Sequence, residues 1–457
     1  MMMRLSEAAL ATRGQVDGAD VAFDAVTTDS RRVAGGDLFI ALKGERFDGH
    51  DFVASCLERG AVAAMVQHEI EKVSPQLVVS DTRLGLGDLA AYWRSKIAIP
   101  LAAITGSNGK TTVKEMLAAI LRETSGVHGV HATEGNLNND IGLPLTLLKL
   151  RAHHRYAVTE MGMNHPGEIA YLTRIAKPDV ALVNNAGTAH LAGLGNIEAV
   201  ARAKGEIFQG LATGGTAVIN ADDAFAPLWR QLAAPHRVLT FGLEQQSDVS
   251  ASHQLMADRS DLSMTTPQGN IGLHLAVPGL HNVRNALAAT AVALALGIGL
   301  DDIKQGLERF SGVKGRLQRK PGRGGAIVID DTYNANPASM RAAISVLSEH
   351  PGRRIFVMGD MGELGNDAAS MHAEIGALAK TAGIDALYAV GVLSTEAFQS
   401  FGAGARHFDT PEALVVALED ELKMGVTVLV KGSRFMRMER VVELLMAEAE
   451  KESRHAA

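Results

Sequence analysis

The sequence predicts an α/β protein of three domains, with mostly parallel, doubly wound sheets in the second and third. Two observations support this prediction. Apolar runs that suit buried strands end in polar residues, and each is followed by a helix-like segment. This alternation occurs as two successive series, which a block of shorter strand-like runs precedes. With 457 residues, of which 47% are hydrophobic and 21% charged, the chain has room for two to four globular domains.

The first domain is predicted to span residues 1–83. Its strand-like runs are "VAFDAV", "DLFIAL" and "AVAAMVQ", separated by turn residues, and one helical stretch starts at Asp51. The pattern indicates a small α/β domain.

The second domain is predicted over residues 84–311 and the third, which is Rossmann-like, over residues 312–457. The clearest strands of the second are "AVTEMG", "VALVNNAG" and "GTAVINADD". Those of the third are "AIVIDDTYNANP", "RIFVMGDMGELG", "ALYAVG" and "VTVLVKGSR". Ligands of such sheets bind at the carboxyl ends of the strands, so the polar residues there are the candidate site residues.

Composition excludes several classes of function. The formal net charge is -7 and no long run of Lys or Arg occurs, which argues against a nucleic-acid partner. The only cysteine is Cys56, which excludes an intramolecular disulfide, fits a reducing compartment and is expected to be a buried structural thiol. The N-terminus lacks the apolar block of a signal peptide, and the most apolar window, residues 286–300, is too short to span a membrane. We expect a cytoplasmic protein without membrane insertion.

The stretch "IPLAAITGSNGKTTVKEMLAAIL" is the most informative in the chain. "LAAIT" suits a buried strand, and from Thr112 apolar residues recur at helical spacing, so the loop between them joins a strand to a helix. Gly106 and Gly109 allow backbone amides to turn toward an anion, and Lys110 adds a full charge. The hydroxyl of Thr111 is then placed for magnesium. The loop is shorter than the common G-x-x-x-x-G-K-S/T, because Ile104 stands where that pattern has its first glycine.

This stretch predicts a nucleotide site formed by Gly106, Ser107, Asn108, Gly109, Lys110, Thr111 and Thr112. A GTPase would also carry N-K-x-D, and no "NK" dipeptide occurs in the chain.

"TGSNGKTT" resembles the ATP loop of the Mur ligases, the ATP-dependent amide-forming enzymes of peptidoglycan precursor synthesis, and of the related folylpolyglutamate synthetases. The resemblance covers essentially the whole chain. "TTDSRRVAGGDLFIALKGERFDGHDF" is similar to the uridine-nucleotide domain of the later Mur ligases, which implies that Ser30, Arg31 and Lys43 contact UDP. From the residues alone, these three fit solvated loops equally well.

In the second domain, "ATEGNLNNDIGLPLTLL" is similar to the segment with which the family holds the muramoyl-peptide, implying contacts from Asn136, Asn138 and Asn139. Glu160 ends a predicted strand next to the phosphate loop, where a magnesium ligand or a helix cap is expected. Asn282 stands at a helix start, where the family contacts adenine and where Asn also serves as an N-cap.

The resemblance also implies a second magnesium site. His190 in "ALVNNAGTAHL" matches the family histidine near that ion, although a lone histidine is more often a packing or capping residue. Lys204 in "VARAKGEIF" matches the lysine that the family carries as a carbamate, although by itself it fits a surface lysine. The implied metal ligands are Thr111, Glu160, His190 and Lys204, and the implied catalytic residues are Lys110, His190, Lys204 and Arg316.

In the third domain, "GRLQ" implies that Arg316 contacts the γ-phosphate, and "IDDTYNANP" implies that Asp331 and Asn336 bind ATP. Tyr333, Asn334 and Lys431 are implied substrate contacts, with Arg434 close to Lys431 in sequence. "IDDTYNANP" is similar to the family member that joins D-alanyl-D-alanine to UDP-N-acetylmuramoyl-tripeptide. The sibling that adds the third amino acid carries a Tyr-Ala-His-like run and a D-N-P-R motif, and no "DNPR" occurs here.

The resemblance therefore implies a monomeric ATP-dependent ligase that uses two Mg²⁺ ions and passes through an acyl phosphate. Its implied partners are UDP-N-acetylmuramoyl-tripeptide and D-alanyl-D-alanine. The alternatives are the sibling ligase, a folylpolyglutamate synthetase, against which the UDP-like first block argues, and a nucleotide-dependent switch or binding module.

Overall fold

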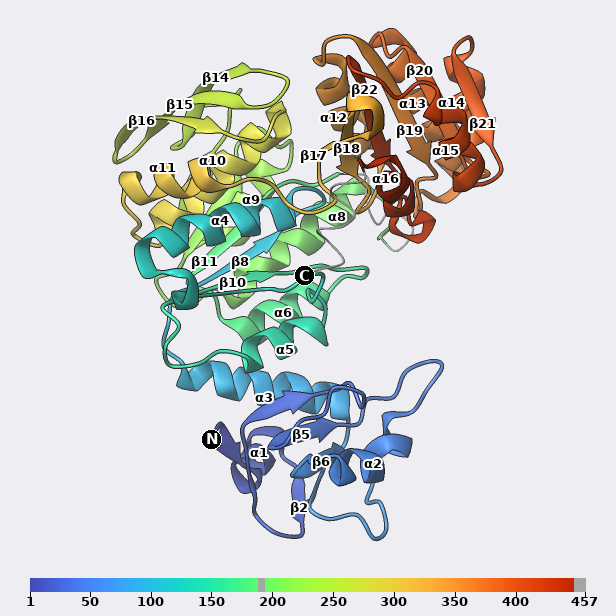
Figure 1. The fold of residues 1–457 in the computed structure, drawn as a ribbon. Helices are drawn as coiled ribbons and strands as arrows, with labels where there is room; N and C mark the ends of the chain where they lie inside the picture. The colour runs from blue at the N-terminus through green and yellow to red at the C-terminus, as the bar shows by residue number, and fades with distance from the viewer. Residues whose placement is uncertain (188–193, 448–457) are drawn as a thin grey trace.

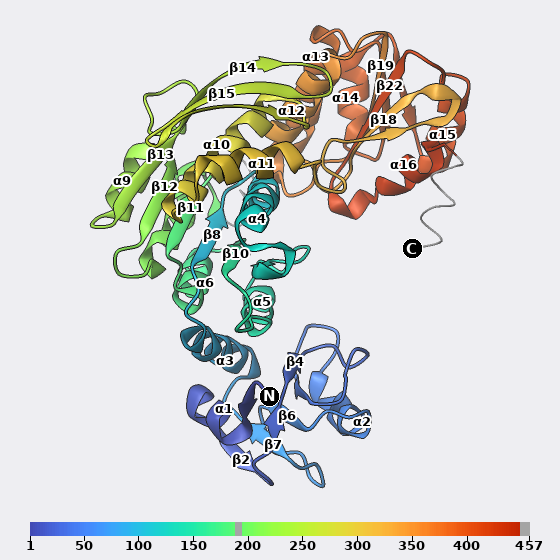
Figure 2. The ribbon, with the colours of Figure 1, turned by 60° about the vertical axis from the view of Figure 1, so that its left-hand side comes forward.

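The computed structural model describes residues 1–187 and 194–447. Figures 1 and 2 show three α/β units in chain order, with the first unit at one end, the central sheet in the middle and the last unit at the other end. The predicted α/β class, with mostly parallel sheets, is confirmed.

The first unit has a five-stranded sheet of order β2-β7-β6-β5-β4, in which β2 is antiparallel and the other strands are parallel. A two-stranded ribbon pairs β1 with β3. Its elements are β1 (Met3–Arg4), α1 (Leu5–Thr12), β2 (Gln15–Asp17), β3 (Ala22–Phe23), β4 (Ala25–Thr27), β5 (Asp37–Ile40), η1 (Gly49–Phe52), α2 (Val53–Glu58), β6 (Ala63–Val66) and β7 (Gln76–Val78). Cys56 is fully buried on α2, as expected, and burial raises the pKa of its thiol.

The central sheet has six parallel strands in the order β13-β12-β11-β8-β10-β9. Its elements are α3 (Thr82–Lys96), β8 (Leu101–Thr105), α4 (Lys110–Ser125), η2 (Val127–Gly129), β9 (Val130–Ala132), α5 (Gly142–Leu148), β10 (Tyr156–Glu160), α6 (Glu168–Ala176), β11 (Val180–Val183), α8 (Ile197–Gly205), η3 (Glu206–Gly210), β12 (Thr216–Asn220), α9 (Ala226–Ala233) and β13 (Arg237–Phe241). The chain fills the β9 side of β8 first and then moves to the β11 side. This switch point lies at the end of β8, where α/β sheets bind ligands.

A three-stranded antiparallel sheet, which the sequence analysis did not predict, follows the central sheet. It contains β14 (Ser250–Leu255), β15 (Ser260–Thr266) and β16 (Gly269–Leu275), and two helices follow it, α10 (Leu280–Ala295) and α11 (Leu300–Arg309). One apolar core joins this sheet, α4, α10, α11 and one face of the central sheet. Helix α10 is apolar nearly all round because it is buried on most sides.

The last unit has a sheet of order β17-β18-β22-β19-β20-β21, in which β17 is antiparallel and the other strands are parallel. Its elements are β17 (Gln318–Pro321), η4 (Arg323–Gly325), β18 (Ile327–Asp331), α12 (Pro337–Ser348), β19 (Arg353–Gly359), η5 (Gly365–Asp367), α13 (Ala368–Thr381), β20 (Ala386–Val390), α14 (Ser394–Phe401), β21 (Ala405–Phe408), α15 (Pro411–Glu419), β22 (Val426–Lys431), η6 (Arg434–Met436) and α16 (Glu439–Leu445). Separate apolar clusters cover its two faces.

Helix α3 connects the first unit to the central one. Its buried residues Leu86, Leu89 and Trp93 belong to a single apolar core that runs from Met2 to Ala233. In both ribbon views α3 lies between the first unit and the helices α5 and α6 (Figures 1 and 2). Across residues 1–187 and 194–447, we find no helix that is long and apolar enough to cross a membrane.

Candidate active site

A cavity of about 1290 Å³ lies where the carboxyl ends of the central strands face the last unit. Both units line it. The central unit contributes the loop after β8, the ends of β10, β11 and β12, and the start of α10, and the last unit contributes the end of β18 and the segments 362–364 and 431–437.

The loop after β8 joins a buried strand to a helix, as predicted. Gly109 is the N-cap of α4 and has φ of 81°, a left-handed conformation that favours glycine. A Cβ atom here would lie 2.4 Å from Oδ1 of Asn285, so the site is also too crowded for a side chain. The Lys110 Nζ donates to the Gly106 carbonyl at 2.7 Å. Burial lowers the pKa of Lys110, while the Glu160 carboxylate opposes that shift.

Two asparagines at the end of β11 support the loop from behind. Asn185 accepts the Ser107 N–H at its carbonyl (3.0 Å) and the Asn108 N–H at Oδ1 (2.9 Å). Asn184 donates to the Asn108 carbonyl at 3.0 Å. This pair is not among the predicted site residues, although its position at the end of a central strand is a usable signal.

Thr111 and Glu160 meet in the cavity. The Thr111 hydroxyl donates to Oε2 of Glu160 at 2.9 Å, and Asn138 Nδ2 donates to Oε1 at 2.8 Å. A hydroxyl and a carboxylate are oxygen donors of the kind that Mg²⁺ prefers, so these two residues fit a magnesium site. Within the described part of the chain, no three His, Cys, Asp or Glu residues group to hold a metal. His190 lies outside the described residues.

Lys204 is almost completely buried, at 1% exposure, near the end of α8. Burial, together with the nearby charge of Lys110, lowers the pKa of Lys204 well below its ordinary value. The structure therefore buries Lys204 rather than leaving it on the surface, although Lys204 is not among the described residues that line the cavity.

Arg316 reaches the phosphate loop from the segment before β17. Its Nη2 donates to the Thr111 hydroxyl at 3.0 Å, and its guanidinium lies 4.2 Å from the centre of the Tyr333 ring. Its buried Nε has no hydrogen-bond partner in the described part of the chain. An unpaired donor in a ligand cavity is consistent with binding an anion.

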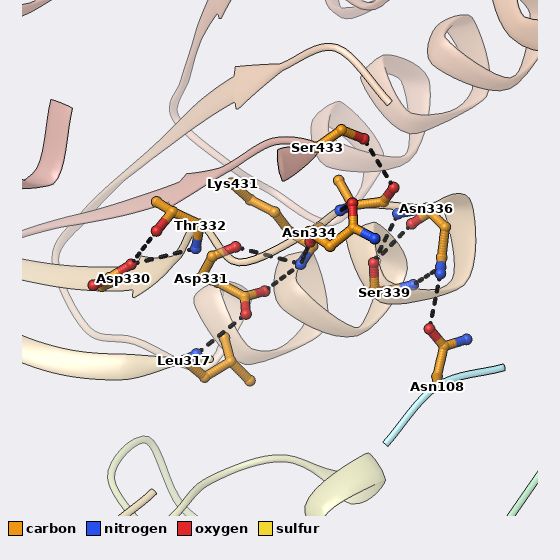
Figure 3. A network of polar contacts seen from close by, with 11 residues as sticks. Asn108, Leu317, Asp330, Asp331, Thr332, Asn334, Asn336, Ser339, Lys431 and Ser433 are labelled. Atoms are coloured by element: carbon orange, nitrogen blue, oxygen red, sulfur yellow. Dashed lines mark hydrogen bonds and ion pairs between the residues drawn. The ribbon is translucent and has the colours of Figure 1, made fainter. Parts of the chain in front are cut away.

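Asp331 and Lys431 form an ion pair of 2.7 Å at the ends of β18 and β22 (Figure 3). Burial raises the pKa of Asp331, and the ammonium of Lys431 opposes this. Lys431 also donates to the Asn334 carbonyl at 2.9 Å. Asp331, predicted to bind ATP, and Lys431, predicted to contact a substrate, therefore lie in one site.

Asn336 connects the last unit to the phosphate loop (Figure 3). It caps α12 in a capping box with Ser339, and its Nδ2 donates to Oδ1 of Asn108 at 2.8 Å. Asn334 Oδ1 accepts the Ala335 N–H at 2.9 Å. Side chains predicted as ATP contacts therefore meet across the two units.

At the start of α10, Asn282 lines the cavity and donates to the Pro278 carbonyl at 2.8 Å. Its neighbour His281, which the sequence analysis did not select, also lines the cavity. Burial lowers the pKa of His281 to about 4, and the charges of Lys431 and Arg284 add to this.

Some predicted site residues lie apart from this cavity. Ser30, Arg31 and Lys43 belong to the first unit, where Arg31 pairs with Asp29 at 2.9 Å. Asn136 is exposed and does not line the cavity. Asn139 lines it, but its Oδ1 accepts the Gly142 N–H at the start of α5 (2.8 Å).

A phosphate loop on a parallel sheet, with a second α/β unit across the same cavity, is the arrangement of a nucleotide-dependent enzyme. Family models match three consecutive parts of the chain: "Mur ligase family, catalytic domain" at residues 10–94, "Mur ligase middle domain" at 104–293 and "Mur ligase, glutamate ligase domain" at 315–434. The chain belongs to the Mur ligase family.

Similar proteins cover nearly all of the chain. UDP-N-acetylmuramoyl-tripeptide–D-alanyl-D-alanine ligase of Escherichia coli (strain K12) is 44% identical over 436 residues, covering 94% of this chain and 96% of its own. A crystal structure of MurF from Acinetobacter baumannii has a TM-score of 0.90 and 40% identity, covering 96% of this chain and 98% of its own. A structure of MurF ligase from Thermotoga maritima in complex with ADP has a TM-score of 0.84 and 30% identity, and the match covers 94% of this chain and 98% of that one.

Proposed function

We propose that this chain joins D-alanyl-D-alanine to UDP-N-acetylmuramoyl-tripeptide and converts ATP to ADP and phosphate in the process. The observation that supports this most is the meeting of Lys110, Thr111 and Arg316, from two units, at one cavity in a chain whose relatives are named for this reaction. The closing of two α/β units over a nucleotide is typical of enzymes that exclude water from a reactive intermediate.

The reaction begins at a carboxylate, which is a poor electrophile. The peptide carboxylate attacks the γ-phosphorus of ATP, and ADP leaves, giving an acyl phosphate. The neutral amine of D-alanyl-D-alanine then attacks the acyl carbon, phosphate leaves, and the amine proton is lost. Lys110 and Arg316 compensate the negative charge that develops during phosphoryl transfer.

The nucleotide site comprises the phosphate loop from Gly106 to Thr112, with Asn282 at the base, Asp331 at the ribose, and Arg316 and Asn336 at the phosphates. For Asp331 to bind ribose hydroxyls, its ion pair with Lys431 must leave one carboxylate oxygen accessible. The pair is itself in the cavity wall, which supports this role.

Magnesium would be held by Thr111 and Glu160, whose oxygens are already within hydrogen-bond distance of each other. When bound, the ion neutralises charge on the phosphates. For a second magnesium site we propose His190 and Lys204.

Lys204 acts as a carbamate in this proposal. An ammonium repels a cation, whereas the neutral amine adds to carbon dioxide and, on losing a proton, becomes an anion with two oxygen donors. Burial of Lys204 beside Lys110 supports this, because it favours the neutral amine that the addition requires.

UDP-N-acetylmuramoyl-tripeptide, the acyl donor, binds the first unit through Ser30, Arg31 and Lys43. Its peptide passes Asn136, Asn138 and Asn139 toward the phosphate loop. Tyr333, Asn334 and Lys431 contact the substrates from the last unit.

We further propose that the domain boundaries lie at 83/84 and 311/312 and that the protein is a monomer. Because the reaction consumes ATP, we propose that it takes place in the cytoplasm.

Incubation with ATP, UDP-N-acetylmuramoyl-tripeptide and D-alanyl-D-alanine, followed by mass analysis, tests the proposal. The expected product is the UDP-linked pentapeptide, with one phosphate released per product. A product formed instead from the dipeptide precursor and a single amino acid would identify the sibling activity. Phosphate release that needs neither substrate would identify a nucleotide switch.

A further inference from the structure

The segment 133–140, "TEGNLNND", runs from the end of β9 to the start of α5 and has no regular secondary structure. Most of its side chains are exposed or half-buried, and its one large apolar residue, Leu137, is only half-buried. Apolar packing therefore contributes little to its position. Polar contacts hold it instead, and they are concentrated at its two ends and at Asn138.

Lys114 holds the first end. This lysine lies one turn after Lys110 on α4, is 1% exposed, and donates to the Thr133 carbonyl at 2.6 Å while pairing with Glu115 at 2.7 Å. A buried ammonium is unfavourable unless it is paired and hydrogen-bonded. Lys114 thus has an ion-pair partner in Glu115 and a hydrogen-bond partner in the backbone of the segment.

Thr133 connects the segment directly to Glu160, the predicted magnesium ligand. Its hydroxyl oxygen accepts the Glu160 N–H at 3.0 Å, and both side chains are buried. At the centre of the segment, Asn138 donates to Glu160 and its carbonyl accepts the Gly162 N–H at 2.8 Å. Any displacement of the segment therefore displaces the groups around Glu160.

Arg83 holds the other end from a different helix. Its guanidinium forms a bidentate pair with Asp140, with Nη2 donating to Oδ1 at 2.8 Å, and both residues line the cavity. Arg83 is in the first turn of α3, and the neighbouring Thr82 hydroxyl donates to the Ala41 carbonyl of the first unit at 2.8 Å. The bidentate geometry fixes orientation as well as distance.

We propose that Lys114 and Arg83 are positioning residues that clamp segment 133–140 between the phosphate-loop helix and the first unit. By holding the segment in place, the two residues position the terminal carboxylate of the bound tripeptide at the phosphate loop. They also couple binding of the UDP moiety in the first unit to the position of Glu160. Neither residue needs to touch the reacting atoms. The inference rests on the proposed function.

The first experiment compares Lys114→Met, Thr133→Val and Thr133→Ser with the wild type. Initial rates are measured with the donor varied at saturating ATP, and with ATP varied at saturating donor. Loss of one charge-assisted or buried hydrogen bond is expected to raise the donor KM or lower kcat by about 10- to 100-fold, with a smaller change in the KM for ATP. Thr133→Ser keeps the hydroxyl and is expected to behave like the wild type.

The second experiment tests the other end with Arg83→Gln and Arg83→Lys. Calorimetric titration of UDP-N-acetylmuramoyl-tripeptide without ATP is expected to show weaker binding, by about tenfold, in both variants, because lysine cannot form the bidentate pair. Arg309→Gln is the matched control, since it breaks an exposed pair with Glu123 away from the cavity.

Wild-type donor KM, kcat and donor affinity in Lys114→Met, Thr133→Val and Arg83→Gln would overturn the inference while leaving the proposed function intact. Equal losses in Thr133→Ser and Thr133→Val, or in Arg309→Gln and Arg83→Gln, would also overturn it, because they would indicate general destabilisation. A wild-type protein that forms no pentapeptide would instead overturn the proposed function.

Discussion

The ammonium of Lys110 is held by the carbonyl of its own loop, at a place where a nucleotide phosphate would be a stronger partner. Lys110→Met is expected to lower kcat by at least about 100-fold, because the charge acts on the transition state. The thermal midpoint should not fall, since the substitution removes a partly desolvated charge. Lys380→Met, which changes an exposed lysine of the last unit, controls for the loss of a lysine. A variant with most of its turnover would contradict the phosphate-loop assignment.

Lys204 gives a second prediction at the residue scale. Lys204→Ala should lose most activity, and acetate or another short carboxylate should restore part of it by supplying an oxygen ligand in the vacated space. Carbon-13 NMR of the wild-type protein in ¹³C-bicarbonate buffer should show a carbamate carbonyl signal that is missing in Lys204→Ala. Full activity of the alanine variant, or an unmodified lysine in the working enzyme with magnesium, would refute the carbamate.

Among the elements, α12 has an N-cap with two separable tasks. The Asn336 Oδ1 accepts the Ser339 N–H, while Nδ2 contacts the phosphate loop through Asn108. Asn336→Ala should lose both, with a cost of about 1 kcal/mol in the free energy of unfolding. Asn336→Asp keeps a good N-cap but replaces the amide donor with a negative charge. It should therefore unfold like the wild type in urea yet show a raised KM for ATP, and equal KM values would refute the interdomain role.

Strand β9 and the loop between α5 and β10 bring two histidine rings close to that of His154: its centroid lies 4.2 Å from the centroid of His153 and 5.1 Å from that of His131. Burial lowers the pKa of His154 to about 4 from 6.5, and His131, His153 and Arg151 add to the shift. Between these pH values the unfolded chain binds more protons, so the free energy of unfolding should fall as pH decreases from 6.5 to about 4.

Urea unfolding at pH 7 and pH 5 measures this contribution. His154→Gln should show a smaller loss of stability between the two pH values than the wild type. His253→Gln, on the exposed strand β14, is the control for removing a histidine. If His154→Gln loses as much free energy of unfolding between pH 7 and pH 5 as the wild type does, the proposed proton linkage is ruled out.

For the whole molecule, the contacts of Arg316 and Asn336 with the phosphate loop predict that nucleotide and donor together stabilise a closed arrangement of the last unit. Small-angle scattering should show a smaller radius of gyration with both ligands than with neither. Arg316→Ala should weaken this response because it removes one of the two contacts. The same radius of gyration with and without ligands would contradict ligand-induced closure.

Sequence patterns predicted the architecture well because parallel strands are buried on both faces and read as continuous apolar runs. They also located the phosphate loop, since its glycines, lysine and helix start are adjacent in the chain. The partners of these residues were harder to predict. Asn185, Arg83 and Lys114 act through contacts with residues distant in sequence, and an isolated lysine or arginine carries no local sign of burial. The antiparallel sheet β14–β16 was missed because its strands lack the continuous apolar runs that identified the parallel strands: β14 is largely exposed, and β15 alternates buried with more exposed residues.

The apolar core that α3 shares with the first and central units has a thermodynamic consequence. Elements that share one core lose their packing together, whereas the clusters of the last unit contain only residues of that unit. Heating should therefore produce two calorimetric transitions, one for residues up to about Ser311 and one for the remainder. ADP, which contacts both parts in the proposed nucleotide site, should move the two transitions toward each other. The enzyme would then melt as two blocks, and the boundary between them would cross its own nucleotide site.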